Sequence, residues 1–369
     1  MEPHPIETPL ARILKSLIQH DGPMTFRDFM QAALYHPVYG FYTQGPRIGT
    51  ADGAFHTNAN FQPFAFSLAQ WMIQAQHLLG ESLRIIELGA GTGQLAERIL
   101  SWLPEILHNY VIVEPSEGLR TQQTRRGLHV VSDLSALSHA PTLVFANEVL
   151  DALPFHRVMG DGKGGIQELF VGLDHNGEFV ERFDQPSTPQ LHQHLASMAM
   201  TLGRGQLAEI NLDVSTFMQD VTQVMSKGYL LFIDYGAHAH VLYGHERRNG
   251  TLRCFKEQRE VFDPFDYVGE QDLTADVNWT AVEQAADKND LVKVGLVSQG
   301  TWLQKIGIAH YAEHVPQDTN ALAEITCLTK GSLLGSTFDV LGFKTPGLPD
   351  APGFSYPLSS EPTDVAQTS

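Results

Sequence analysis

Apolar residues recur along this chain with two periods, one typical of helices and one typical of buried strands. The helical period predicts an amphipathic helix at about 10–20, a second from Thr25, where "TFRD" resembles a capping box, and a third over 61–79. From residue 84, helices from Gln94 and from about 116 alternate with the apolar runs "RIIEL", "YVIVE", "HVVSD" and "PTLVFANE". This alternation predicts a parallel sheet with ligands at the carboxyl ends of its strands.

The alternation breaks after "PTLVFANE". Residues 157–185 predict a hairpin that turns at Asn176-Gly177, followed by a helical stretch to about 226. The sheet then resumes with "GYLLFIDYG", "LVKVGLVSQG" and "FDVLGFKT". We therefore expect an α/β fold with a Rossmann-like, seven-stranded, mostly parallel sheet. The predicted segments are a helical and hairpin extension (1–80), the first half of a core (81–156), an inserted substrate lobe (157–226), the second half of the core (227–345) and a loose tail (346–369).

The composition indicates a globular protein without a nucleic-acid partner. The 369 residues are 43% hydrophobic and 18% charged, which is enough apolar material for a large core. The formal net charge is −18, which disfavours broad contact with phosphate backbones or anionic membranes. The one basic cluster, "HERRNG", is too small to form a nucleic-acid-binding stripe.

The two cysteines and the first residues of the chain indicate the cellular compartment that we expect for the protein. Cys254 and Cys327 could form one bridge at most, which favours a reducing compartment. The opening "MEPHPIETPLARILKSLIQH" lacks the features of a secretory signal or a transit peptide, and no apolar run reaches the roughly 18 residues of a membrane span. We expect a cytoplasmic protein without membrane insertion.

The stretch "IIELGAGTGQLAERIL" places Gly89, Gly91 and Gly93 between a strand and a helix. Glycines at such a turn let the backbone approach a ligand closely and let the helix pack on the strand. The dinucleotide fingerprint G-x-G-x-x-G needs its third glycine one residue later. The strand also carries Glu87, whose carboxylate repels phosphate and attracts a cation. S-adenosylmethionine (SAM), with a sulfonium, an ammonium and no phosphate, fits this charge better than a nicotinamide dinucleotide.

Two further acids follow the next two strands. Glu114 comes 21 residues after Gly93, at the place where a nucleoside-binding sheet puts an acid for the ribose hydroxyls. Asp133 ends the third strand, where it could accept a hydrogen bond from the adenine amino group or cap a helix. Three acids at consecutive strand ends predict a cofactor site.

The fourth strand runs into "FANEVLDALPFHRV", which brings Asn147, Glu148 and Asp151 to the expected position of the transferable methyl group. Methyl transfer needs alignment and electrostatics more than acid-base help. An arginine acceptor stays charged, so carboxylates could both hold its guanidinium and stabilise its charge. The alternative is that Glu148 and Asp151 cap a following helix.

The motifs "ELGAGTG", "ANEVLDALPFHRV", "FIDYG", "GTLRCF" and "DPFDYVGEQDLTADVNWTAVEQAA" together resemble the MidA-like class I methyltransferases. Mitochondrial members of that family assist the assembly of respiratory complex I and are regarded as protein arginine methyltransferases. The resemblance runs from about residue 24 to residue 310. It implies a class I methyltransferase fold, SAM as cofactor and a protein arginine as acceptor. It also implies that the cofactor lies at Glu87, Gly89, Gly91, Gly93 and Glu114, and that Asn147, Glu148 and Asp151 form the active centre.

The chain departs from the family pattern at four positions. Ala54, Ala59 and Asn60 stand where the family has an aspartate, a proline and a glutamate, and Asn278 replaces another aspartate. If those acids hold a cationic acceptor, this chain uses a different acceptor or has kept the fold as a non-catalytic assembly protein. A nicotinamide-dependent oxidoreductase is the other alternative.

Histidines are the remaining candidates for chemistry. His238, His240 and His245 follow the fifth strand, but no carboxylate pattern accompanies them, so we expect no metal site. His192 and His194 are expected at exposed helix positions. The inserted lobe is compatible with a homodimer.

Overall fold

A computed structural model describes residues 7–45, 57–257, 259–315, 317, 319–331 and 333–354. The chain divides into two compact units, each made of three separate segments. Unit 1 comprises Met1–Phe55, Leu150–Phe217 and Gly236–Glu283, and unit 2 comprises His56–Val149, Met218–Tyr235 and Gln284–Ser369. The helices α7 (Val214–Gln223) and α9 (Trp279–Lys288) each begin in unit 1 and end in unit 2.

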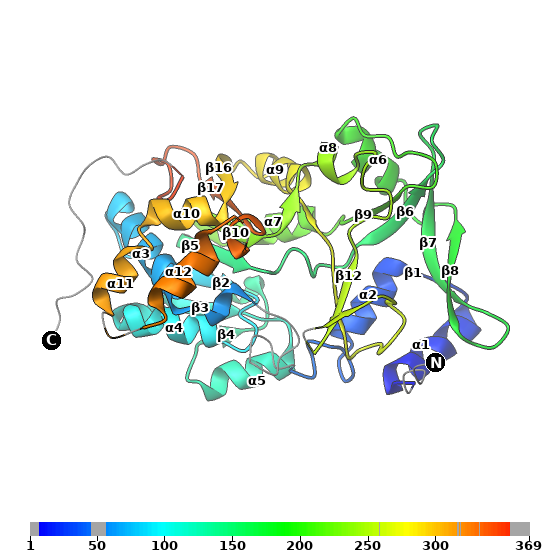
Figure 1. Ribbon diagram of the computed structural model, residues 1–369, viewed down its shortest axis with the longest axis horizontal. Coiled ribbons are helices and arrows are strands. Elements are labelled where there is room, and N and C mark those ends of the chain that lie inside the picture. The colour runs from blue at the N-terminus through cyan, green and yellow to red at the C-terminus, as the bar shows by residue number, and fades with distance from the viewer. Residues whose placement is uncertain are drawn as a thin grey trace. The chain divides into compact units, whose positions relative to one another are not determined.

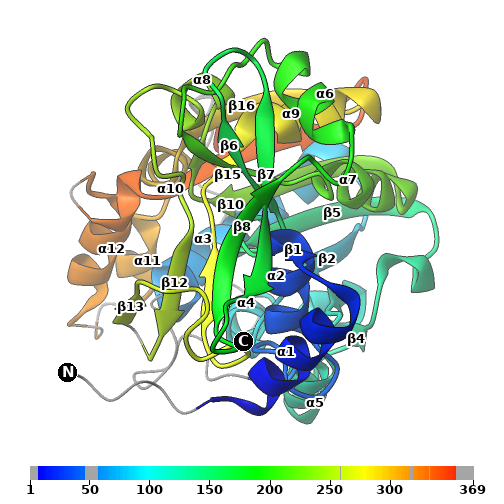
Figure 2. The same cartoon turned by 90° about the vertical axis from the view of Figure 1, so that its right-hand side faces the viewer.

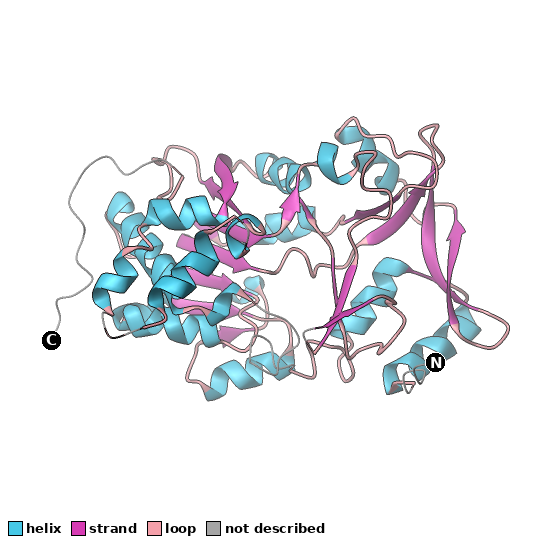
Figure 3. Ribbon diagram, viewed as in Figure 1, coloured by secondary structure: helices cyan, strands magenta, loops and turns pink. Residues whose placement is uncertain are grey.

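A mixed sheet forms the centre of unit 2. Within the described residues it has seven strands in the order β16-β17-β10-β5-β2-β3-β4 (Figures 1 and 3). β2, β3, β4, β5 and β10 pair in parallel, whereas β17 runs antiparallel to both of its neighbours, β10 and β16. The strands are Arg84–Leu88 (β2), Tyr110–Val113 (β3), Val130–Val131 (β4), Ala140–Asn147 (β5), Met225–Asp234 (β10), Val292–Ser298 (β16) and Asp339–Lys344 (β17). The predicted seven-stranded, mostly parallel sheet is confirmed.

The central strands of this sheet are buried on both faces. Consecutive residues of β5, Val144 and Phe145, point to opposite faces and both are inaccessible to solvent, as are Leu230 and Leu231 of β10. This explains why the sequence shows unbroken apolar runs here instead of alternation. Helices and 3₁₀ turns connect or flank the strands: η1 (Asn58–Asn60), α3 (Gln62–Leu79), α4 (Gln94–Trp102), η2 (Pro104–Asn109), α5 (Glu117–Arg125), η3 (Leu134–Ala136), α10 (Gln299–Ile306), α11 (His310–His314), α12 (Ala321–Thr329) and η4 (Leu334–Ser336).

Unit 1 contains an antiparallel sheet and the N-terminal helices. In the described part of the chain, five strands form this sheet in the order β1-β7-β6-β9, with β8 also pairing with β7; Figure 2 shows β6, β7 and β8 side by side. The predicted hairpin is confirmed, since β7 and β8 pair antiparallel around Asn176-Gly177. The strands are Met24–Thr25 (β1), His156–Gly160 (β6), Ile166–Leu173 (β7), Phe179–Asp184 (β8) and Leu207–Ile210 (β9), with helices α1 (Pro9–Asp21), α2 (Phe26–Tyr35), α6 (Gln190–Ser197) and α8 (Ala239–Leu242).

One expectation for unit 1 fails. The helical stretch predicted to reach residue 226 is interrupted by β9, because "LAEI" pairs with β6 and buries Ala208 and Ile210 in the core. Tertiary pairing therefore overrides the local pattern. The other short strands of unit 1 are Gly236–Ala237 (β11), Arg253–Lys256 (β12), Arg259–Val261 (β13), Asp272–Thr274 (β14) and Val277–Asn278 (β15).

Candidate functional site

The glycine turn joins β2 to α4 in unit 2. Gly89, Gly91 and Gly93 have φ values of 63°, 54° and 81°, which side-chain-bearing residues rarely adopt. A Cβ atom on Gly89 would lie 2.8 Å from a Val149 methyl carbon, and one on Gly93 would lie 2.8 Å from a Leu128 methyl carbon. These two glycines are therefore needed for packing within the protein itself. Of the two roles expected of these glycines, ligand approach and helix packing, the structure shows packing at Gly89 and Gly93, and Gly91 remains the candidate for ligand approach.

Glu87 is the penultimate residue of β2, the strand that leads into the glycine turn. Its side chain is buried, and the Tyr110 hydroxyl donates a hydrogen bond to its Oε2 over 2.8 Å. Burial raises the pKa of Glu87 to about 8, more than the tyrosine hydrogen bond lowers it. A buried carboxyl group of this kind gains most from a positive ligand, which would restore the ionised state.

Glu114 follows β3, the strand adjacent to β2. It is buried, and burial raises its pKa to about 7, against hydrogen bonds from the Ser116 backbone N–H and the Gln123 side chain. The Ser116 N–H lies 2.9 Å from Oε1, and the Gln123 amide also donates to the Gly91 carbonyl over 2.8 Å. Gln123 thus connects the acid to the glycine turn, a contact that sequence spacing did not indicate. Both carboxyls suit a ligand with hydroxyl donors and positive charge.

Asp133 follows β4 and is exposed. The Ser135 backbone N–H donates to its Oδ1 over 3.0 Å, so Asp133 caps the 3₁₀ turn η3. Hydrogen bonds from the hydroxyls of Ser135 and Ser132 lower the pKa of this carboxyl. The capping alternative is therefore confirmed, and the adenine contact stays a prediction.

The two roles of Asp133 can be separated by substitution. Asp133→Ala should weaken S-adenosylhomocysteine binding about tenfold if the carboxylate accepts a hydrogen bond from the adenine amino group. Asp133→Asn should retain most of the affinity, because its amide oxygen still accepts. Isothermal titration of the three proteins checks this. An affinity unchanged in Asp133→Ala would reduce Asp133 to its capping role.

Glu148 directly follows β5 and has φ 55°, a left-handed conformation that costs free energy for a residue with a side chain. Its Oε1 accepts three hydrogen bonds, from Thr57 Oγ1 at 2.5 Å, the Asn58 backbone N–H at 3.2 Å and Asn147 Nδ2 at 2.9 Å. The next residue is also fixed, because the Val149 N–H donates to Asp234 Oδ2 over 3.2 Å. The structure thus over-determines an unfavourable backbone conformation, which is a common property of functional sites.

No helix follows Glu148. Residues 148–155, all of them described, form turns and loop until β6 begins at His156. The alternative that Glu148 and Asp151 cap a helix is therefore wrong. Asn147 and Glu148 are brought together as predicted, but Thr57 and Asn58 were missed. The only signal for them was the retained threonine in "GAFHTNAN".

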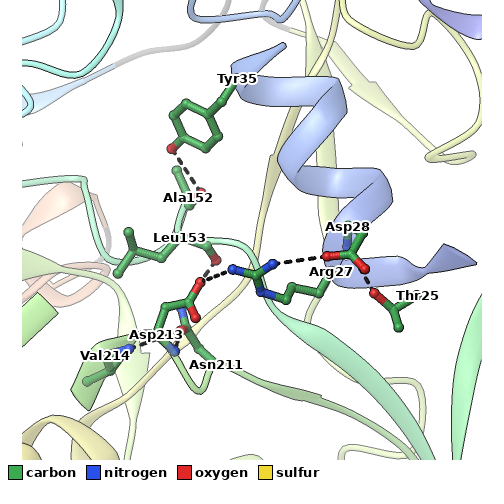
Figure 4. Close-up of polar contacts among 9 residues, drawn as sticks. All are labelled: Thr25, Arg27, Asp28, Tyr35, Ala152, Leu153, Asn211, Asp213 and Val214. Atoms are coloured by element: carbon green, nitrogen blue, oxygen red, sulfur yellow. Dashed lines mark hydrogen bonds and ion pairs between the residues drawn. The ribbon is translucent and has the colours of Figure 1, made fainter. Parts of the chain in front are cut away.

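Asp151 belongs to unit 1, where it is buried and its backbone carbonyl accepts a hydrogen bond from the Ala275 N–H over 3.1 Å. The next two residues are held through their backbone carbonyls, as Figure 4 shows. The Ala152 carbonyl accepts a hydrogen bond from the Tyr35 hydroxyl, and the Leu153 carbonyl accepts one from the Asn211 amide. Asp151 also lines a cavity of about 30 Å³, room for roughly one water molecule. Its grouping with Asn147 and Glu148 stays a prediction.

Three of the positions that depart from the family pattern are described. Asn278 serves as a connector in unit 1, since its Nδ2 donates to the Tyr243 hydroxyl and its Oδ1 accepts from the Ala281 N–H near the start of α9. Ala59 and Asn60 form part of η1 in unit 2, and the Ala59 carbonyl accepts from Arg98. Ala54 lies outside the described residues.

The histidines show structural contacts. His238 and His240 stack with their ring centroids 6.0 Å apart, and His238 Nε2 lies 3.2 Å from a Glu283 carboxylate oxygen. His192 is exposed and His194 is half-buried. Across the part of the chain that the structure describes, no group of three or more His, Cys, Asp or Glu residues could hold a metal ion. The same part holds no helix both long and apolar enough to cross a bilayer.

Comparison with known proteins identifies the family to which the chain belongs. Residues 67–297 match the model of a family of putative S-adenosyl-L-methionine-dependent methyltransferases. The chain belongs to this family. The crystal structure of a protein from Burkholderia thailandensis, bound to S-adenosyl-homocysteine, has a TM-score of 0.84 and 29% identity over 95% of this chain and 97% of that one. The resemblance to MidA-like proteins, the class I methyltransferase fold and the cofactor SAM are thereby confirmed, and the nicotinamide alternative is excluded.

Curated relatives carry more specific names. The protein arginine methyltransferase NDUFAF7 of Danio rerio is 26% identical over 341 residues, covering 81% of this chain and 78% of the relative. Its homologue in Caenorhabditis elegans is 25% identical over 338 residues, covering 82% and 77%. Both are named mitochondrial, and this overturns the predicted cytoplasmic location. The prediction used cysteine usage, which indicates a reducing compartment. More than one compartment is reducing, so this signal does not identify which of them holds the protein.

The two raised pKa values give the cofactor affinity a pH dependence. Below pH 7 the carboxyls of Glu87 and Glu114 are largely neutral, and a cationic cofactor must displace their protons. We expect the affinity for S-adenosylmethionine, which carries the sulfonium charge, to rise by about tenfold to 100-fold per pH unit between pH 6 and 7, because each carboxyl contributes up to tenfold, and to level off above about pH 8, where both carboxyls are ionised. Isothermal titration across this range measures the profile. The slope should flatten in Glu87→Gln, and a flat profile in the wild type would contradict the assignment.

Proposed function

We propose that this SAM-dependent methyltransferase transfers the methyl group to an arginine side chain of a protein. The observation that carries the proposal is the Glu148 carboxylate, held in a left-handed backbone conformation at the end of β5 by three hydrogen bonds to one of its oxygens. The printed names of the relatives support the same acceptor.

The glycine turn and the acids of β2 and β3 are the residues proposed to hold the cofactor. The positive charges of the cofactor suit the carboxyls of Glu87 and Glu114, whose pKa values are raised by burial. Hydrogen bonds from Ser116 and Gln123 keep the Glu114 side chain oriented. When bound, the cofactor supplies an activated methyl group on sulfur. The chain's contribution is to fix the position of the acceptor nitrogen and to balance charge.

Glu148 is proposed to orient the acceptor guanidinium. During transfer a nitrogen–carbon bond forms, the sulfur–carbon bond breaks with its electron pair left on sulfur, and the nitrogen releases one proton to solvent. A fixed carboxylate beside the guanidinium stabilises the positive charge that the product retains. Because the carboxylate is oriented before the acceptor binds, little reorganisation accompanies the reaction.

The acceptor is tested by transfer of a labelled methyl group. Purified protein and tritiated SAM are added to an extract of cells that lack this chain, and the labelled products are hydrolysed and analysed by mass spectrometry for methylated arginine and lysine. Methylarginine is the expected product. Label in other residues, or an unchanged methylarginine inventory, would contradict the proposal.

A non-catalytic assembly protein remains the second candidate function, favoured by the residues Ala54 and Asn60 in place of acids. Cells that carry only Glu148→Gln discriminate the two. A catalyst should fail in these cells, whereas an assembly protein should work as before.

A further inference from the structure

Gln299, the first residue of α10, has an orientation that its neighbours determine. It is completely buried, and its Nε2 donates to the Leu328 carbonyl over 3.4 Å. A carbonyl oxygen only accepts, so the amide must present its nitrogen to Leu328. Its Oε1 therefore points to Asn58.

Asn58 is completely buried as well, and its orientation follows from that of Gln299. Its Nδ2 donates to Gln299 Oε1 over 2.7 Å, so its own amide oxygen is directed elsewhere. This oxygen, Oδ1, is buried and has no hydrogen-bond partner among the residues that the structure describes. Buried amide oxygens without a partner are rare in proteins and usually indicate a ligand or a water molecule.

Asn147 repeats this pattern. Its Nδ2 donates to Glu148 Oε1 over 2.9 Å, and its Oδ1 is buried, again with no partner in the described ranges. The backbone N–H of Asn58 donates to the same carboxylate oxygen over 3.2 Å. Asn58 and Asn147 therefore both contact Glu148, and both have an amide oxygen left over.

The Glu148 carboxylate and the two amide oxygens can only accept hydrogen bonds, so a ligand that binds to all three must supply several N–H groups, and a positive charge on it suits the carboxylate. A planar guanidinium has five such groups in a fixed arrangement, whereas an ammonium has three around one atom. Resting on the proposed function, we propose that Asn58 and Asn147 present their amide oxygens to the guanidinium of the acceptor and select arginine over lysine. Gln299 acts as a positioning residue, because it fixes the orientation of the Asn58 amide.

Small probes test this selection in protein saturated with S-adenosylhomocysteine. The probes are the Nα-acetyl methylamides of arginine, lysine and citrulline, with affinities measured by NMR titration. The wild type should bind the arginine probe at least about tenfold more tightly than either of the others. Equal affinities for arginine and lysine would overturn the proposal.

Three variants separate the possible roles. Asn58→Leu with Gln299→Met replaces both partners by apolar side chains and keeps the site filled; Asn147→Ala removes the second oxygen independently, in case the first variant does not fold. Each should lower the affinity for the arginine probe about tenfold, with the affinity for S-adenosylhomocysteine within twofold of wild type. The control Gln62→Ala, a half-buried residue at the start of α3 in the same unit, should change neither affinity.

The outcomes are distinct. A tenfold loss of S-adenosylhomocysteine affinity would assign the oxygens to the cofactor's ammonium and overturn the proposal. Unchanged or equally reduced affinities for all probes would indicate bound water and would also overturn it. If the wild type methylates protein arginine in the extract and the variants do so equally well, only this inference fails. If the wild type makes no methylarginine, the proposed function fails.

Discussion

Glu148→Gln should lower kcat by about 100-fold to 1,000-fold and leave the affinity for S-adenosylhomocysteine unchanged. The substitution removes one negative charge and keeps the shape of the side chain. A glutamine Oε1 can still accept from Thr57, Asn58 and Asn147, so the conformation of the site is retained. The loss therefore measures the charge together with the change of Oε2 from an acceptor to an amide donor. The measurement is the transfer of tritiated methyl groups to extract proteins, with the affinity determined by calorimetry.

The matched control for this variant is Glu105→Gln, an exposed acid in η2 of the same unit. It should behave as wild type in both assays. A Glu148→Gln protein with at least half of the wild-type kcat would remove Glu148 from the reaction. A melting temperature several degrees below wild type would show that the substitution disturbs the fold and that the loss of activity cannot be assigned to charge.

Glu114→Ala should weaken S-adenosylhomocysteine binding by about 100-fold, because two hydrogen bonds between a carboxylate and ribose hydroxyls contribute roughly 3 kcal/mol together. The stability of the free protein should fall less than the affinity, because the pKa of about 7 means that the buried carboxyl is already half neutral near pH 7. We therefore expect a large loss of affinity with a small loss of stability. Isothermal titration gives the first quantity and thermal melting the second.

Glu117→Ala provides the control for Glu114→Ala, since Glu117 lies three residues later in the first turn of α5 and is exposed. Its affinity for S-adenosylhomocysteine should stay within twofold of wild type. If the affinity of Glu114→Ala also stays within that range, the ribose assignment is incorrect.

The sheet of unit 2 was predictable because its strands carry two independent signals. Each is an apolar run, and a polar residue stands at or beside the carboxyl end of β2, β3 and β5, namely Glu87, Glu114 and Asn147. β9 was not predictable, because "LAEI" is short and forms a strand only through pairing with β6. Local pattern contains no information about such a partner.

The site follows the same division. Glu87 and Glu114 were predictable as acids at neighbouring strand ends because the carboxyl ends of parallel strands lie at one edge of the sheet, and their contact with the cofactor stays a prediction. Thr57, Asn58 and Gln299 were missed because their importance depends on contacts between residues as much as 241 positions apart in the chain. The sequence pattern explains Gly89 and Gly93 partly by the close approach of a ligand. In the structure, a Cβ atom on Gly89 would meet Val149 and one on Gly93 would meet Leu128, so packing requires both glycines.

The place of β17 in the sheet has a consequence for biosynthesis. This strand, Asp339–Lys344, inserts between β10 and β16, which precede it in the chain and do not pair with each other. Until β17 has left the ribosome, both neighbours present an unpaired edge that can recruit strands from other molecules. Nascent or prematurely terminated chains should therefore depend on chaperones far more than the finished protein does.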